Sequence, residues 1–168
     1  DMVELVPADF FTWLIREIHK QYPEIVFIAE VYQKELYSKY IREVGFDLLY
    51  DKSGMYDTIR AIVQKNTDDS GVPVEAWQST RKITWNWQSL GDLQPYMLNF
   101  LENHDEQRFA SDFFGKDAGN VFAALYASLY FNRASFMIYS GQEVGERGMY
   151  QEGFSGKDGR STIFDWYT

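Results

Sequence analysis

The chain has 168 residues, of which 45% are hydrophobic, and its formal net charge is −9. That length suits one domain with a core of its own, and the acidic balance argues against a nucleic-acid partner, whose phosphate backbone attracts basic surfaces. Cysteine is absent, which excludes disulfides and thiolate metal sites but leaves the compartment open. No apolar stretch of the sequence reaches the length of a membrane-spanning helix.

The first predicted unit is a helix followed by a strand. Residues 7–21 predict a helix because their apolar side chains recur on one helical face. The run Ile-Val-Phe-Ile-Ala at 25–29 is typical of a strand buried on both faces, as in a parallel sheet. This run ends in the charged residue Glu30.

A second unit repeats this order. Residues 36–44 have helical spacing, and Gly45 is a natural C-terminal stop. The apolar run 46–50 predicts the next strand, which ends at Asp51. Ser53 is expected to cap a third helix that follows.

The rest of the chain continues the alternation. A polar loop over 66–73 leads to an expected helix over 74–88, whose tryptophans we assign to packing. Two further strand candidates, 96–101 and 135–139, flank a strongly apolar helix over 118–131.

The alternation predicts an α/β fold with βαβ units and a parallel sheet. The four strands are expected near 25–30, 46–51, 96–102 and 135–140. Three of them end in polar residues on the carboxyl side, where barrels and open α/β sheets place their active sites. No Gly-rich phosphate loop follows a strand, so no nucleotide cofactor is predicted.

Two carboxylates at strand ends are candidates for chemistry. Glu30 follows one apolar run, and Asp105 ends the sequence Asn103-His104-Asp105 after another. Each taken alone also fits a capping or ion-paired residue, but two close carboxylates can divide the acid and nucleophile roles at a glycosidic bond. His104 is one of 2 histidines, and no H-E-x-x-H spacing occurs, so no metal ligand is assigned.

Four segments resemble those of the α-amylase superfamily of glycoside hydrolases. Phe-Leu-Glu-Asn-His-Asp at 100–105 is similar to the family's F-x-x-N-H-D segment and is the most specific match. Phe-Ile-Ala-Glu-Val at 27–31 resembles the segment of the general acid. Residues 1–4 resemble the end of the nucleophile segment, and 138–143 resemble the last-strand segment.

This resemblance implies roles for individual residues. Asp1 would be the nucleophile, Glu30 the general acid and base, and Asp105 the stabiliser of the transition state, with retention by two displacements. His104 would hold the sugar next to the scissile bond. Neighbouring residues expected to bind substrate are Asn103, Tyr32, Arg108 and Glu102. Glu102 and Arg108 could equally form a local ion pair.

The resemblance also implies the fold, which is roughly the second half of a TIM-type (β/α)8 barrel. Residues 1–168 would form a single partial unit, with the upstream half of the barrel missing and little activity in isolation. The substrate would be an α-glucan such as starch or a maltooligosaccharide. Alternatives are a transglycosylase of the same family, a non-catalytic amylase-like domain for carbohydrate binding or assembly, and an unrelated α/β sugar-binding module.

Several properties stay open at this point. Many family members carry Lys-His where this chain has Glu4-Leu5, so the resemblance does not imply the family's usual contact with the product-side sugar at these two positions. The segments that usually bind calcium lie mostly upstream, so calcium is undetermined. Linkage preference, oligomeric state and compartment are also open, although export would suit an enzyme that acts on polymeric starch.

Overall fold

The computed structural model describes residues 2–64, 81–116, 118–131, 133–148 and 159–160. Its centre is one sheet of four parallel strands in the order β1-β2-β3-β4, which confirms the predicted α/β class. Each strand lies within the segment where one was expected: β1 Ile28–Ala29, β2 Leu48–Tyr50, β3 Met97–Phe100 and β4 Ser135–Met137.

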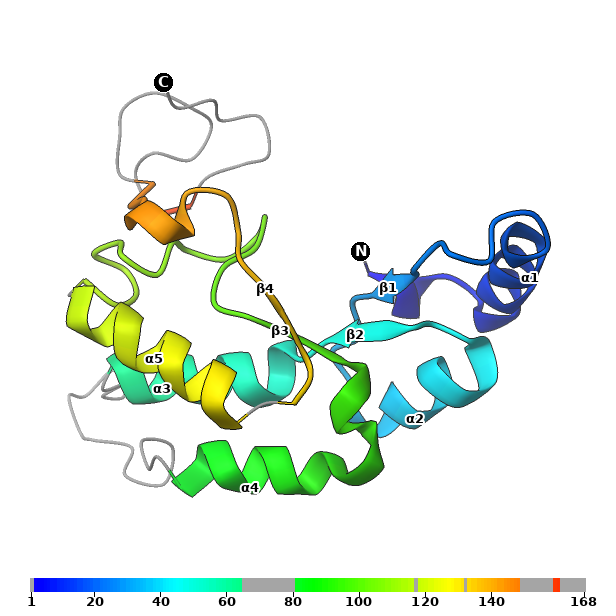
Figure 1. Ribbon diagram of the computed structural model, residues 1–168, viewed down its shortest axis with the longest axis horizontal. Helices are drawn as coiled ribbons and strands as arrows, with labels where there is room; N and C mark the ends of the chain where they lie inside the picture. The colour runs from blue at the N-terminus through cyan, green and yellow to red at the C-terminus, as the bar shows by residue number, and fades with distance from the viewer. Residues whose placement is uncertain (1, 65–80, 117, 132, 149–158, 161–168) are drawn as a thin grey trace.

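Helices connect the strands and lie to the right of, below and to the left of the sheet in Figure 1. The α-helices are α1 Ala8–His19, α2 Tyr37–Lys39, α3 Asp57–Gln64, α4 Arg81–Leu90 and α5 Ala118–Phe131. Shorter 3-10 turns are η1 Val3–Leu5, η2 Lys34–Leu36, η5 Gly91–Tyr96 and η6 Gln142–Val144, and two π-helical turns are η3 Tyr40–Val44 and η4 Lys52–Tyr56.

The segment expected as one helix over 36–44 changes its winding twice along its length. It ends in the π-turn η3, closed by the Gly45 amide, which donates to the Tyr40 carbonyl at 3.1 Å. The wider turn buries Tyr40 and Val44 together in the core. Gly45 has φ of +99°, a conformation that favours glycine and stops the helix where the sequence indicated.

The helix after β2 is capped by Asp51, not by Ser53 as expected. The Asp51 carboxylate accepts a hydrogen bond from the Met55 amide at 3.1 Å. Asp51 is buried directly at the end of β2, so its carboxylate reaches the free amides of the turn that begins one residue later.

The expectation that the run 25–29 is buried on both faces is wrong. Ile28 is 45% exposed, and Ile25 and Val26 are exposed as well, whereas Ala29 is fully buried. The reason is position: among the described residues β1 lies at the edge of the sheet and pairs with β2 on one side.

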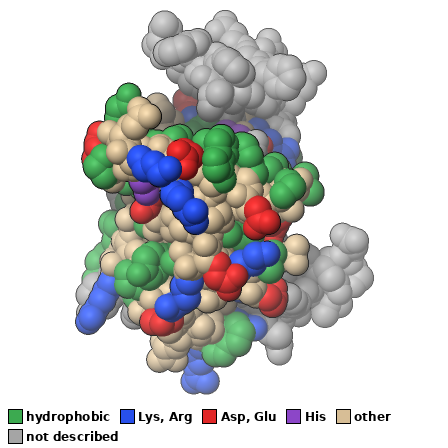
Figure 2. All heavy atoms as spheres, turned by 90° about the vertical axis from the view of Figure 1, so that its right-hand side faces the viewer, with side chains coloured by type: hydrophobic (Ala, Val, Ile, Leu, Met, Phe, Trp, Pro, Cys, Tyr) green, Lys and Arg blue, Asp and Glu red, His purple; other side chains and the backbone are tan. Residues whose placement is uncertain are grey.

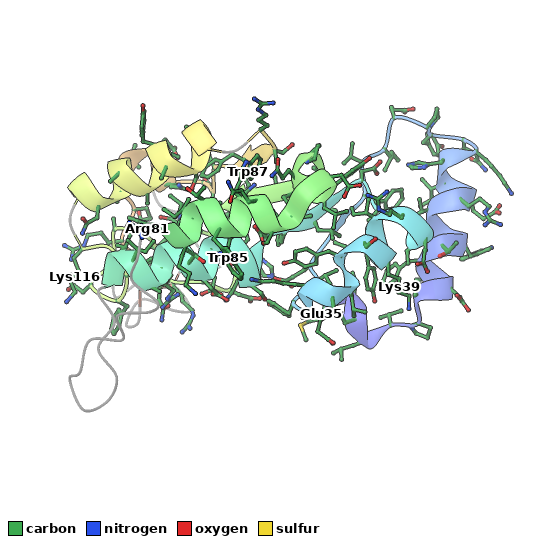
Figure 3. The ribbon with its side chains drawn as sticks, turned by 90° about the horizontal axis from the view of Figure 1, so that it is seen from below. Glu35, Lys39, Arg81, Trp85, Trp87 and Lys116 are labelled. Carbon is green, nitrogen blue, oxygen red and sulfur yellow. The ribbon has the colours of Figure 1, made fainter. Side chains whose placement is uncertain are left out.

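Two hydrophobic clusters hold the sheet to its helices. The first joins β1, β2 and the start of β3 to α1, α2 and η3. In the second, Phe100 of β3 stacks on Tyr56, with 5.0 Å between ring centroids, and α3, α4 and α5 pack around them. Trp87 of α4 packs against this cluster as expected, but Trp85 points to the other side of the helix and is 59% exposed (Figure 3).

The α1 end of the molecule carries hydrophobic side chains scattered among charged ones (Figure 2). Phe10 and Trp13 of α1 contribute to this surface. None of the helices in the described ranges combines the length and the apolar character that crossing a membrane requires.

Candidate active site

The carboxyl ends of the four parallel strands bring polar side chains to one edge of the sheet. Glu30 follows β1, Asp51 follows β2, Glu102 and Asn103 follow β3, and Tyr139 follows β4. Because Ile28 pairs with Leu48 and Ala29 with Leu49, the next residues along, Glu30 and Tyr50, point to the same side of the sheet.

Glu30 is a buried carboxylate whose two oxygens each accept a hydrogen bond. The Tyr32 hydroxyl donates to Oε1 at 3.1 Å, and the Met2 amide donates to Oε2 at 3.4 Å. These two donors fix the orientation of the carboxylate at the carboxyl end of β1. A group that transfers a proton needs such a fixed orientation.

Tyr32 links Glu30 to Asp105 electrostatically. Burial raises the pKa of Tyr32, and the negative charges of Glu30, Asp105 and Glu106 raise it further. The hydroxyl therefore stays protonated near neutral pH and keeps donating to Glu30. Glu30 follows β1 and Asp105 lies in the turn after β3, so the parallel sheet places these residues, 75 positions apart in the sequence, at the same end of the sheet.

Asp1, the third predicted carboxylate, lies outside the described residues. The residue that follows it, Met2, is the one whose amide reaches Glu30. Glu4 accepts a hydrogen bond from the Gln33 amide at 3.0 Å, so the segment after Asp1 is attached to the loop after β1.

Asp105 lies on a tight turn built by Asn103. The Asn103 Oδ1 atom accepts from the amides of Asp105 and Glu106, each at 2.9 Å. The Asp105 side chain is 54% exposed, and its Oδ2 lies 3.5 Å from His104 Nε2. Asn103 therefore shapes the turn, while the carboxylate of Asp105 and the imidazole of His104 project from it.

Glu102 and Arg108 form the ion pair that the sequence left as an alternative. The pair is buried, with 2.6 Å between Glu102 Oε2 and Arg108 Nη1, and Glu102 Oε1 accepts from the Phe109 amide at 2.8 Å. The guanidinium lies over the Tyr139 ring, 4.7 Å from its centroid. Burial raises the pKa of Glu102, and the bond from Arg108 opposes that rise. Direct substrate contact by either residue stays a prediction.

Two site residues escaped the sequence analysis. Tyr50 is half-buried beside Glu30, and burial followed by the charge of Glu30 raises its pKa. Its position at the end of β2, on the side of the sheet that Glu30 faces, is the signal that could have revealed it. Glu106 follows Asp105 and pairs with Arg60, a residue 46 positions away, which no local pattern indicates.

The described part of the chain holds no group of three or more His, Asp or Glu side chains able to bind a metal ion.

Comparisons with known proteins point to one family. A family model described as the alpha amylase catalytic domain matches residues 7–164. The solved structure of cyclic alpha-maltosyl-(1→6)-maltose hydrolase from Arthrobacter globiformis with maltose is similar at 18% identity and a TM-score of 0.62, covering 98% of this chain and 35% of that one. The ligand-free form of the same hydrolase is similar at 19% identity and a TM-score of 0.60, and the match covers 98% of this chain and 34% of that one. At such identities the likeness shows the fold alone, and the chain spans about a third of these proteins. No curated protein matches the chain.

Proposed function

The chain belongs to the α-amylase catalytic-domain family, and from that premise we propose that it carries the catalytic carboxylates of a retaining glycoside hydrolase acting on α-glucosidic bonds. The observation that carries the proposal is the environment of Glu30. This carboxylate is buried, accepts a hydrogen bond at each oxygen, and follows β1 at the end of the parallel sheet where the Asp105 turn follows β3.

The proposed reaction has two displacements. In the first, the Asp1 carboxylate attacks the anomeric carbon, the bond to the leaving oxygen breaks, and Glu30 gives that oxygen its proton. In the second, Glu30 takes a proton from water, and the water oxygen displaces Asp1 from the anomeric carbon. Both carboxylates end in their starting states, and the sugar keeps its configuration.

Asp105 and His104 are proposed to bind the sugar that reacts. Asp105 projects from its turn with an exposed carboxylate, so it can accept hydrogen bonds from sugar hydroxyls as positive charge develops on the ring. His104 lies beside it and can bond a neighbouring hydroxyl. Tyr32 contributes a rigid ring next to Glu30, where the leaving sugar would lie.

We propose starch or maltooligosaccharides as the substrate. The structurally similar hydrolase from Arthrobacter globiformis is named for a substrate built of maltose units, and one of its structures contains maltose. The family match supports the same class of α-glucan for this chain.

We also propose that the chain is one part of a (β/α)8 barrel whose other strands come from outside it. Among the described residues the sheet is open, and Ile28 on β1 and Ile138 after β4 are 45% and 59% exposed. Additional strands beside β1 and β4 would cover these side chains and pair the free edges. The protein with the whole barrel is called the complete enzyme below.

The test is hydrolysis of maltohexaose by the complete enzyme, with the anomeric configuration of new ends followed by NMR. We expect α-configured products first, and a loss of roughly 10²–10⁴-fold in kcat for Glu30→Gln. Glu24→Gln, at an exposed glutamate near the same strand, is the matched control and should keep full activity. Products of inverted configuration would contradict the mechanism, and longer oligosaccharides would indicate transglycosylation. Binding without cleavage would favour a non-catalytic carbohydrate-binding domain.

A further inference from the structure

We infer that Glu106 is a positioning residue, which fixes the turn carrying Asp105 through ion pairs with Arg60 and Lys52. The inference rests on the role proposed for Asp105 and extends it to residues on η4 and α3.

The contacts of the Asp105 side chain are too weak to fix its position. It is 54% exposed, and its neighbour His104 is at 3.5 Å, with a side chain that is 36% exposed. The position of Asp105 must therefore come from its backbone and from the residues on either side. On the backbone, Asn103 Oδ1 binds its amide, and Arg160 Nε donates to its carbonyl at 2.8 Å.

The residue directly after Asp105 is tied by charged and polar contacts to η4 and α3. Glu106 Oε2 accepts from Arg60 Nη1 and from the Tyr56 hydroxyl, each at 2.9 Å. Its other oxygen, Oε1, lies 3.3 Å from Lys52 Nζ. Both carboxylate oxygens thus face cations or donors from η4 and α3.

These partners are themselves fixed by packing. Tyr56 is fully buried and stacks on Phe100 of β3, and Arg60 lies over the Phe114 ring, 5.0 Å from its centroid. Arg60 also donates to the Tyr56 hydroxyl at 2.8 Å. The result is a continuous path of contacts from β3 through Tyr56 to Glu106, which gives the turn a rigid support.

The ion pairs of Glu106 are partly shielded from water, so they can contribute to holding the turn in place. The exposed fractions of the side chains are 15% for Glu106, 22% for Arg60 and 19% for Lys52. The pair between Glu17 and Lys20, by contrast, has side chains that are 41% and 61% exposed. Water and salt screen the exposed pair more strongly, so loss of charge should have a larger effect at Glu106.

Loss of the Glu106 ion pairs should affect Asp105 because Glu106 and Asp105 lie on the same turn. The amides of both bind the same Asn103 oxygen. A neutral side chain at position 106 would leave Arg60 and Lys52 without this charge and let the turn shift. A displacement of about 1 Å at a reacting group can reduce a rate by roughly 10²-fold.

The first test is kinetic and uses the complete enzyme with maltohexaose. Glu106→Gln should lower kcat by about 10- to 100-fold while KM changes by less than about 3-fold, because the transition state depends on Asp105 more than ground-state binding does. The same substitution at the exposed pair, Glu17→Gln, should leave both constants unchanged. Arg60→Lys, which keeps the charge, should retain more of kcat than Arg60→Leu. A normal kcat in folded Glu106→Gln enzyme, with only a lower unfolding temperature, would overturn the inference.

The second test does not depend on activity. A crystal structure of the Glu106→Gln enzyme should show the Asp105 carboxylate displaced, with Glu30 and the sheet unmoved. An unmoved Asp105 would overturn the inference even if the parent enzyme is an active hydrolase. If the parent enzyme cleaves no glucan but Asp105 moves, the proposed function fails while the positioning of the turn by Glu106 stands.

Discussion

Arg108 and Glu102 form a buried ion pair, with 2.6 Å between Nη1 and Oε2, and the turn that carries Asp105 lies between them in the chain. Removal of one partner leaves the other charge buried and unpaired, so Arg108→Leu should destabilise the fold by about 3–5 kcal/mol. Urea unfolding of the complete enzyme measures this. Arg42→Leu, which breaks an exposed pair with Asp92, should lower stability by less than about 1 kcal/mol. Equal losses in the two variants would show that burial of the Arg108 pair has no energetic weight.

The hydroxyl of Tyr32 should support the rate by orienting Glu30 and not by exchanging its own proton. Tyr32→Phe removes the 3.1 Å hydrogen bond that orients Glu30, and we expect kcat to fall by about 10-fold, the equivalent of a hydrogen bond to a charged group. Burial and the charge of Glu30 raise the pKa of Tyr32, so the hydroxyl does not titrate in the assay range. The alkaline limb of the pH–rate profile does not arise from Tyr32 and should therefore still be present in the variant. Its disappearance in Tyr32→Phe would contradict this, and Tyr22→Phe, at an exposed tyrosine, is the control.

Asp51 should make the fold less stable as pH rises. Its pKa is raised because burial removes the carboxylate from water, although bonds from Met55 and Tyr37 and the charge of Lys34 oppose the shift. The folded state therefore holds this proton more tightly than the unfolded state. From about pH 4, the ordinary value for aspartate, stability due to Asp51 falls until the pH passes the raised folded value.

Asp51→Asn isolates this effect because an amide does not titrate. The unfolding free energy of the parent minus that of the variant, measured in urea between pH 4 and 8, should decrease with rising pH. An increase over the same interval would mean that the fold prefers the ionised carboxylate.

The 168-residue chain alone should associate and turn over poorly. Among the described residues the sheet is open at β1 and β4, and Ile138 directly after β4 and Val144 of η6 are 59% and 79% exposed. Unpaired strands with apolar neighbours are sites of aggregation. Light scattering should detect oligomers, and Ile138→Lys should reduce them. A monomeric chain with activity close to that of the complete enzyme would contradict this prediction.

The sequence alone determined the order of elements and the positions of the segments that resemble those of the α-amylase family. The apolar run 118–131 forms α5, and the four strands fall within the apolar runs where strands were predicted. These features follow from the local periodicity of apolar residues and from their covalent order along the chain. Packing does not change that order. The Asn-His-Asp segment at 103–105 could be recognised from the sequence because its three residues are consecutive.

Only the tertiary structure decided how those segments meet. Tyr32 and Met2 both bind Glu30, although Met2 is 28 residues away, and Glu106 finds Arg60 across 46 residues. It also decided that the Glu102 pair is buried and that the first strand is exposed at an edge, against expectation. Such contacts depend on which surfaces pack together, and burial then sets the strength of each charge interaction, so neither can be derived from residues that are neighbours in sequence.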